Sequence, residues 1–232
     1  VYIKCSLLRL MLPVGRTEKI IGGHEAEPHS RPYMAFIEKN LANNEPSYCD
    51  GFLLNEDFVM TAAHCQAKFL HIFLHMFDRT VEKAFPHENY KKNEFIDDIM
   101  LLKLSSKVVV NNFVKPIALA NHDDVTLPTS CIVSGWGQTH SNGRISDKLM
   151  ETNVTLTENS ICTELKLYCS NGTAGPGKGD SGGPLVCGHG TAYGVVSFMY
   201  QYSKDLSTVA YTKIPCYTDW ITSTMKKALS KK

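Results

Sequence analysis

The chain has 232 residues, with 24 lysines and arginines against 23 aspartates and glutamates and a formal net charge of +1. That length can bury a sizeable core in one large all-β domain or two small ones, and a single functional unit is expected. The balanced charge gives no reason to expect a nucleic-acid partner, and no stretch reaches the about 20 apolar residues of a membrane-spanning helix.

Residues 1–19 are expected to hold a partial signal sequence and an activation propeptide. Residues 6–15 have the apolar bias of a signal-peptide core, although Arg9 interrupts it. From Ile20 onward, short apolar segments are separated by turn residues about every eight to twelve positions, which is typical of a β-sandwich or β-barrel.

Four stretches predict strands: a hairpin over residues 51–61, a buried strand over 99–104, and further strands over 131–136 and 193–198. Residues 217–229 carry apolar side chains at helical spacing, so the chain is expected to close with a helix.

Residues 179–184 read Gly-Asp-Ser-Gly-Gly-Pro and present one hydroxyl between glycines. Glycines permit backbone angles that turn the N–H groups of Gly179 and Ser181 toward one point, where an oxyanion could bind. A serine needs a base to become a nucleophile, and the chain supplies His64 in Thr-Ala-Ala-His-Cys and Asp98 before an apolar strand. Alone, the glycine-rich run could be only a surface turn. Three separate strings in the order His, Asp, Ser are far more specific.

With Ile-Ile-Gly-Gly at 20–23 and Ser-Gly-Trp-Gly at 134–137, these strings resemble the trypsin and chymotrypsin family of serine proteases. Within it, residues 20–35 look most like the granzymes and mast-cell chymases, a subgroup that includes duodenase-like proteases. The resemblance runs from Ile20 to the last turn. It implies an all-β fold of two packed six-stranded antiparallel β-barrels with a C-terminal α-helix, in a protease domain over residues 20–232.

The same resemblance implies a secreted or granule-stored serine endopeptidase that needs no metal or other cofactor. Ser181 would attack the scissile carbonyl, His64 would exchange the proton, and Asp98 would orient His64 with help from the Ser197 hydroxyl. The Gly179 and Ser181 N–H groups would hold the oxyanion. Proteins or peptides would be substrates, protease inhibitors would be further partners, and the protein would be a monomer. Apart from the resemblance, the four lysines in residues 225–232 could contact anionic glycans or membranes, and a solvated helix end is the alternative.

Cleavage after Lys19 is expected to free the Ile20 amine, which would fold inward and pair with Asp180. A dipeptidyl peptidase acting on Glu18-Lys19 and a trypsin-like activator are both open as the activating protease. The resemblance places Gly175 at the base of the primary pocket, where trypsin-like members carry an aspartate, so cleavage after basic residues is not expected.

The walls of that pocket are expected to include Ser197 and Met199 on one side and Val209 on the other. Met199 and Val209 would fill space that glycine leaves open, which favours Ala, Val, Leu or Met in the substrate. A shift of register near the short segment from Cys162 to Cys169 is the alternative.

Eight cysteines do not match paired Cys-x-x-Cys zinc patterns, and disulfides are the better account. They imply an oxidising, secretory compartment. Cys5 would leave with the signal sequence, and Cys216 would be a buried free thiol or an intermolecular link. Asn153 and Asn171 satisfy the glycan acceptor pattern. The disulfides that the resemblance implies are Cys49–Cys65, Cys131–Cys187 and Cys162–Cys169.

The chain also departs from the family. The connection from His64 to Asp98 is roughly ten residues shorter than the family template implies. Residues 77–80 look like a tight turn in place of a calcium-binding loop, so no calcium site is predicted. His71 and His75, expected on one side of a strand without a third ligand nearby, predict no zinc site.

Asp50 stands where relatives usually have glycine. These differences leave open a divergent protease, a faulty gene model, or a catalytically inactive homologue that acts as a binding protein on the same fold.

Overall fold

The computed structural model describes residues 20, 22–40, 46–75, 77–122, 128–138, 144–203 and 206–230. The expected signal and propeptide segment, including Cys5 and Lys19, lies outside this part of the chain.

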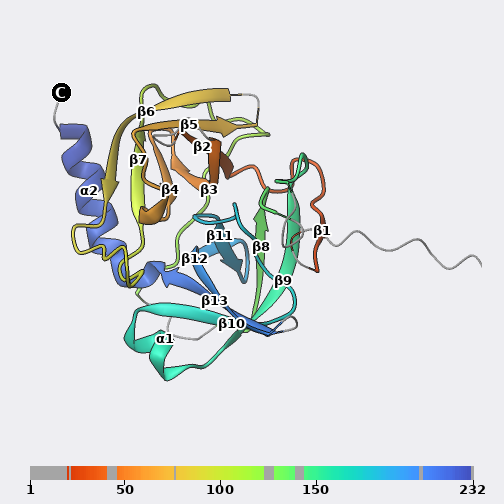
Figure 1. The fold of residues 1–232 in the computed structure, drawn as a ribbon. Helices are drawn as coiled ribbons and strands as arrows, with labels where there is room; N and C mark the ends of the chain where they lie inside the picture. Colours follow the sequence, from red (N-terminus) through yellow and green to blue (C-terminus); the bar gives the residue numbers. More distant parts are fainter. Residues whose placement is uncertain are drawn as a thin grey trace, which may run out of the picture.

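The first half of the chain closes into a six-stranded antiparallel barrel in the order β2-β3-β4-β7-β6-β5 (Figure 1). The predicted hairpin over residues 51–61 joins β3 to β4. In its turn, the Asn55 side chain accepts hydrogen bonds from the N–H groups of Asp57 and Phe58 at 2.9 and 3.1 Å. The strands are β2 (Met34–Asn40), β3 (Pro46–Asn55), β4 (Phe58–Thr61), β5 (Phe69–Leu74), β6 (Phe77–Pro86) and β7 (Met100–Leu104).

The second half forms another closed ring, β9-β10-β13-β12-β11-β8, because β8 also pairs with β9. The short strand β1 (His24–Glu25) adds to the outer side of β9. Two closed six-stranded barrels confirm the predicted fold. The strands are β8 (Ser130–Gly135), β9 (Met150–Thr157), β10 (Leu167–Gly172), β11 (Pro184–Cys187), β12 (Thr191–Ser203) and β13 (Leu206–Lys213).

The predicted C-terminal helix is present as α2 (Thr218–Ser230) and lies along the first barrel beside β6 and β7 (Figure 1). Ile221 and Ala228 of α2 are buried in the core cluster of that barrel. Three shorter helices are η1 (Ala63–Cys65), α1 (Ser160–Glu164) and η2 (Ile214–Tyr217). In the described part of the chain, every helix is too short or too polar to cross a membrane.

The shortened connection is a tight hairpin between β5 and β6, in which Leu74 pairs with Phe77. Residues 77–80 are therefore the start of β6, and the prediction of a turn there was wrong. The turn lies one step earlier, at His75, whose φ is +53°. Both strands keep their partners and the barrel closes. The shortening therefore removes part of a surface loop and leaves every strand of the barrel in place.

The prediction that His71 and His75 face one side of a strand was also wrong. His71 lies in β5, with its Nδ1 3.7 Å from an Asp78 oxygen. His75 lies in the turn, where its ring stacks on Phe113 at 5.2 Å between centroids. The positive φ of His75 turns its side chain away from the pleat.

Three disulfides join Cys49 to Cys65, Cys131 to Cys187 and Cys162 to Cys169, the pairs that the resemblance implied. Cys216 is a free thiol in η2, and it is exposed. The expectation of a buried thiol was wrong because the side chains that η2 buries are those of Ile214, Pro215 and Tyr217.

Candidate active site

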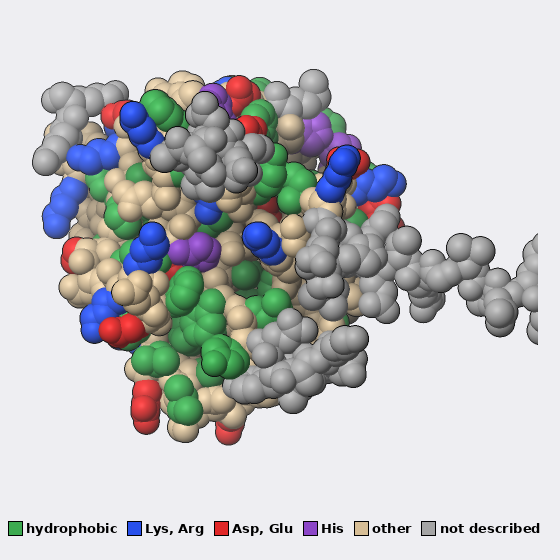
Figure 2. Space-filling view, in the orientation of Figure 1, with side chains coloured by type: hydrophobic (Ala, Val, Ile, Leu, Met, Phe, Trp, Pro, Cys, Tyr) green, Lys and Arg blue, Asp and Glu red, His purple; other side chains and the backbone are tan. Residues whose placement is uncertain are grey.

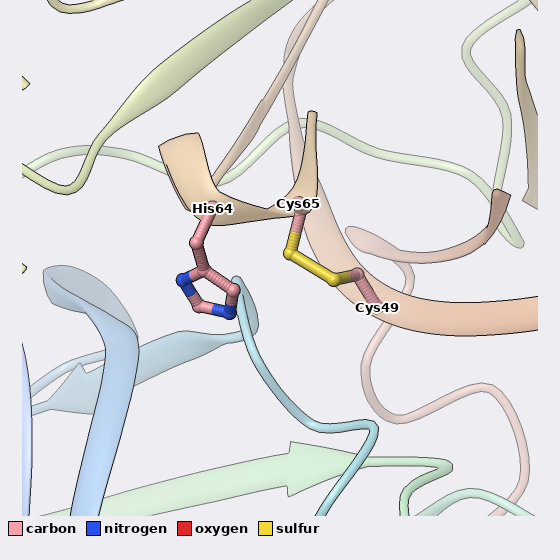
Figure 3. A group of neighbouring side chains, drawn as sticks. All are labelled: Cys49, His64 and Cys65. Atoms are coloured by element: carbon pink, nitrogen blue, oxygen red, sulfur yellow. A yellow bond between two sulfur atoms is a disulfide. The ribbon is translucent and has the colours of Figure 1, made fainter. Parts of the chain in front are cut away.

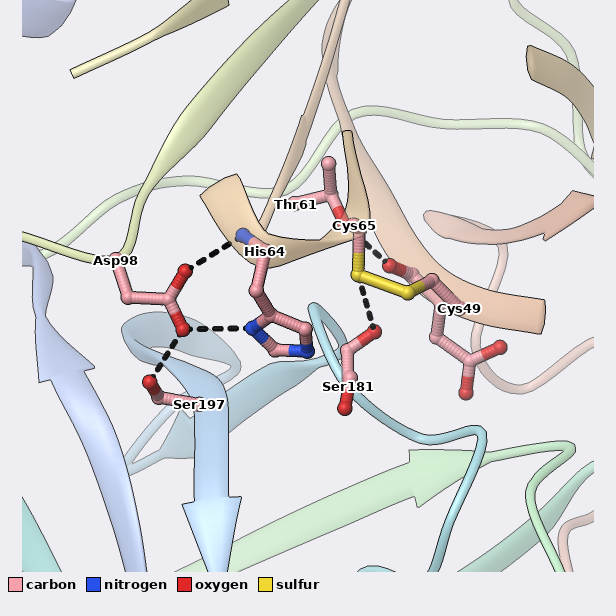
Figure 4. Close-up of a disulfide and its surroundings, with 8 residues drawn as sticks. Cys49, Thr61, His64, Cys65, Asp98, Ser181 and Ser197 are labelled. Carbon is pink, nitrogen blue, oxygen red and sulfur yellow. Dashed lines mark hydrogen bonds and ion pairs between the residues drawn. A yellow bond between two sulfur atoms is a disulfide. The ribbon is translucent and has the colours of Figure 1, made fainter. Parts of the chain in front are cut away.

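His64 and Asp98 come together at the end of the first barrel. His64 lies in η1, directly after β4, and Asp98 lies just before β7. The Asp98 carboxylate accepts the His64 backbone N–H at 2.9 Å through Oδ1 and lies 2.8 Å from His64 Nδ1 through Oδ2 (Figure 4). With Nδ1 as the donor to Asp98, Nε2 of the ring is left as a proton acceptor.

Asp98 is fully buried, and donors from the second barrel complete its environment. Ser197 of β12 donates its hydroxyl to Asp98 Oδ2 at 2.5 Å, as expected from the sequence (Figure 4). Thr212 of β13 donates to the Asp98 carbonyl oxygen at 2.9 Å. Sequence reasoning missed Thr212, because no local motif marks it. The Ser197 hydroxyl offsets part of the cost of burying the carboxylate, whereas Thr212 satisfies the buried main-chain carbonyl of the same residue.

Ser181 lies on the loop between β10 and β11, held at its backbone. Asp50 N–H donates to the Ser181 carbonyl oxygen at 2.8 Å, and Gly182 N–H donates to Val196 O at 2.8 Å. Figure 4 marks no hydrogen bond between the Ser181 side chain and the His64 ring. In unliganded sites such bonds are often long and tighten only when substrate binds.

Cys65 Sγ lies 3.6 Å from the same Ser181 carbonyl oxygen. This is a packing contact, because a disulfide sulfur carries no proton. The disulfide to Cys49 nevertheless places η1 against the serine loop, so it braces His64 beside Ser181.

The loop before Ser181 contains the two N–H groups that are expected to bind an oxyanion. Gly179 has a φ of +110°, a conformation that favours glycine. Within the described residues, the N–H groups of Gly179 and Ser181 donate to no other backbone carbonyl. Both donors are therefore available for a substrate oxygen.

The side chain of Asp180, in this loop, is buried and connects the loop to the second barrel through hydrogen bonds. Its Oδ1 accepts the Gly137 N–H and its Oδ2 accepts the Gly177 N–H, each at 2.6 Å. Burial raises the pKa of Asp180 to about 6. Ile20, whose amine is expected to pair with Asp180, is also fully buried.

Asp50, which stands where relatives usually have glycine, contacts the same loop. It is fully buried, and its Oδ2 accepts the Trp136 N–H at 3.2 Å. Asp50 Oδ2 and Asp180 Oδ1 each lie 2.2 Å from the point that a Cβ on Gly135 would occupy, so the two carboxyl groups are neighbours. Burial, and then the charge of Asp180, raise the pKa of Asp50 well above its usual range. The sequence marked Asp50 as unusual but gave no sign of its partner.

The expected pocket residues lie on three adjacent segments. Val209 and Met199 pair across β13 and β12. A Cβ placed on Gly175 would lie 3.4 Å from Val209 Cγ2, so Val209 packs beside the expected pocket base. Val209 is 2 % exposed whereas Met199 is 41 % exposed, which places Val209 inside and Met199 near the surface.

Hydrophobic side chains are also exposed on the surface of the second barrel. Figure 2 shows them gathered over the region that Figure 1 assigns to β12 and α1. Among the exposed large hydrophobic residues, Met199 and Tyr200 belong to β12 and Ile161 belongs to α1. Closer to His64, the Phe95 ring meets the imidazole edge-on, with 5.7 Å between the ring centroids. Phe95 also contacts Phe198, with 5.3 Å between their ring centroids.

Cys49, His64 and Cys65 place three potential metal-binding atoms within 4.8 Å of one another (Figure 3). Zinc binds cysteine as the thiolate, and here the two sulfurs are joined in a disulfide. These three side chains therefore do not form a metal site, and the disulfide instead holds the segment that carries His64 in place.

Comparisons with known proteins show the family to which the chain is similar. The chain matches the Trypsin family over residues 20–221. It is 38 % identical to granzyme E of Mus musculus, covering 95 % of this chain and 97 % of the relative. It is 40 % identical to mast cell protease 3 of Ovis aries, covering 95 % of each.

A solved structure named "Structure of GrC" superposes with a TM-score of 0.78 at 31 % identity, covering 89 % of this chain and 100 % of that one. The family match, the relatives and the shared fold lead to one conclusion. This chain belongs to the trypsin family of serine proteases, and it is a serine endopeptidase.

Proposed function

We propose that the endopeptidase acts through Ser181, His64 and Asp98. The observation that carries this assignment is the 2.8 Å contact between His64 Nδ1 and a buried Asp98 carboxylate that Ser197 also supports. In this arrangement His64 Nε2 takes the Ser181 proton as the hydroxyl attacks the scissile carbonyl, and later gives a proton to the leaving amine. Asp98 stabilises the imidazolium that forms.

The negative charge that develops on the carbonyl oxygen would be held by the N–H groups of Gly179 and Ser181. Donors fixed in place before the reaction stabilise the transition state more than the bound substrate, and loss of one such donor typically costs about 10²–10³ in kcat. The φ of +110° at Gly179 supports this role, because glycine adopts such a conformation without the strain that a side chain would add.

A fluorophosphonate probe tests the assignment, because it reacts covalently with an activated serine. Processed wild-type protein should be labelled, and both Ser181→Ala and His64→Ala should lose labelling. The control is Ser181→Ala with an unchanged melting temperature. A folded, processed wild type that resists the probe would instead support the catalytically inactive binding protein.

We also propose that the enzyme cleaves after small or medium apolar residues. Gly175 brings no carboxylate to the expected pocket base, and Val209 narrows the space beside it. A library of peptides that varies the residue before the scissile bond should show preference for Ala, Val, Leu or Met. Dominant cleavage after Arg or Lys would reject this pocket.

Activation is proposed to follow cleavage after Lys19, which would free the Ile20 amine to pair with Asp180. An α-amino group has an ordinary pKa of about 8, and pairing with a carboxylate raises it. Activity should therefore persist through neutral pH and fade only as the pH rises above that raised value. Full activity of an uncleaved chain, equal to that of the processed enzyme, would refute this step.

Storage in granules or secretion is proposed from two observations. The three disulfides persist in an oxidising compartment, and relatives include a granzyme and a mast cell protease by name. Expression with an intact secretory leader should place the protein in granules or medium, whereas a reduced cytosolic pool would argue against it. Size-exclusion chromatography, with and without a sulfated polysaccharide, tests the proposed monomer and its anionic partner.

A further inference from the structure

Asp50 and Asp180 place two carboxyl groups in one buried space above Gly135. Asp50 Oδ2 and Asp180 Oδ1 each lie 2.2 Å from the point that a Cβ on Gly135 would occupy. The two oxygens are therefore separated by at most twice that distance. Asp50 is 0 % exposed and Asp180 is 1 % exposed, so water does not screen one from the other.

Two carboxylates in such a space do not both ionise readily, and one proton shared between them removes the repulsion. Asp180 already accepts N–H groups on both oxygens, which favours its ionised form. Asp50 accepts only the Trp136 N–H, and its other oxygen has no hydrogen-bond partner among the described residues. Asp50 is thus the better place for the proton, and its O–H can donate to Asp180.

Few other charges face this pair. The neighbouring residues Thr61 on β4 and Ser134 on β8 are uncharged, and Lys178 on the serine loop is exposed. Ile20 carries an ammonium group only after cleavage. Before cleavage, the described titratable side chain that lies beside the Asp180 carboxylate is therefore Asp50.

We propose that Asp50 is a positioning residue for the oxyanion site, which in its acid form holds Asp180 and the Gly179–Ser181 loop in place before the Ile20 amine is available. This inference rests on the proposed function, since it assigns a support to the proposed oxyanion donors. Asp50 contacts the loop twice, through its side chain to Asp180 and through its backbone N–H to Ser181 O.

The consequence is a low activity of the uncleaved chain that depends on pH. While Asp50 keeps its proton, Asp180 is anchored and the loop presents its donors. As the pH rises and Asp50 ionises, two adjacent buried negative charges push the loop apart. After cleavage the Ile20 ammonium supplies a stronger anchor, so the processed enzyme depends less on Asp50.

The test uses the full-length chain with Lys19→Gln to prevent cleavage, and the processed enzyme as its reference. At each pH from 5.5 to 8, the rate of fluorophosphonate labelling of the uncleaved form is divided by that of the processed form. Effects of pH on the labelling chemistry that are common to both forms cancel in the ratio. Asp50→Asn keeps a donor that cannot ionise, and Asp50→Gly removes the side chain.

For wild type the ratio should fall at least about tenfold across this pH range, because one oxyanion donor is worth about 10²–10³ in rate. With Asp50→Asn it should change less than about threefold. With Asp50→Gly at pH 5.5 it should be at least about tenfold below wild type. A wild-type ratio that is constant with pH, or an Asp50→Gly ratio equal to wild type, would overturn the inference.

The wild-type pH series requires no variant at position 50, so it decides the matter even if a variant fails to fold. Failure of the proposed function looks different. In that case the processed wild type itself is not labelled, whereas failure of this inference leaves the processed enzyme fully reactive.

Discussion

Val209→Gly is expected to widen the primary pocket and shift cleavage toward large aromatic residues. The Val209 side chain is buried, and its Cγ2 lies 3.4 Å from the space above Gly175. Removal of the isopropyl group opens that space next to the expected pocket base. Met199 pairs with Val209 on the neighbouring strand but is far more exposed, so Met199→Gly is the matched control.

The magnitude follows from the atoms removed. Three buried carbons at about 0.8 kcal/mol each give about 2.4 kcal/mol of apolar contact that a Phe side chain could recover. At about 1.4 kcal/mol per tenfold change, this is a gain of up to about 50-fold in kcat/KM for Phe relative to Ala. The same change should lower the free energy of unfolding by about 2–4 kcal/mol, because it leaves a cavity and puts glycine in a strand.

The assay is competitive hydrolysis of matched peptides with Ala, Leu, Phe or Arg before the scissile bond. Val209→Gly should raise the Phe to Ala ratio by more than Met199→Gly does, although Met199→Gly should also extend tolerance toward Phe and Tyr. A larger effect of Met199→Gly, or no change of the ratio in Val209→Gly, would show that Val209 does not line the pocket.

Three further outcomes are expected. Gly182→Ala should lower the free energy of unfolding by more than about 3 kcal/mol in urea, since φ is +87° and the new Cβ would lie 2.0 Å from Thr61 Oγ1. An unchanged urea midpoint would contradict this reasoning. Ser197→Ala removes a donor to Asp98 and should lower kcat about tenfold with little change in KM, whereas a change in KM alone would point to substrate binding. Asp50→Asn should gain stability relative to wild type as pH rises from 4.5 to 7.5. Because the pKa of Asp50 is raised in the folded state, that carboxyl favours folding below its ordinary pKa and loses this contribution as pH rises through the raised value. Equal urea midpoints of the two proteins at both pH values would show that folding does not raise the pKa of the Asp50 carboxyl.

Some features of this protein follow from local sequence. Short apolar segments predicted the hairpin over residues 51–61, and helical spacing predicted α2. Strings such as Gly-Asp-Ser-Gly are short enough to be recognised without a fold. Periodicity and turn chemistry act over a few residues, so a sequence displays them directly.

Other features depend on which strands become neighbours. The position of the turn at His75 and the exposure of Cys216 follow from β-register and from the face of η2 that packs, and both predictions failed there. Register is set by the burial of a whole strand, and one residue of shift moves each side chain to the other face.

The deepest contacts of the site were decided by closure of the two barrels. Asp98 meets Ser197 and Thr212 across separations of 99 and 114 residues, and Asp180 meets Asp50 from a different barrel. The sequence marked Asp50 as unusual but could not name its partner. Such contacts arise because packing forces buried polar groups to find donors wherever the fold places them, and no local pattern records that choice.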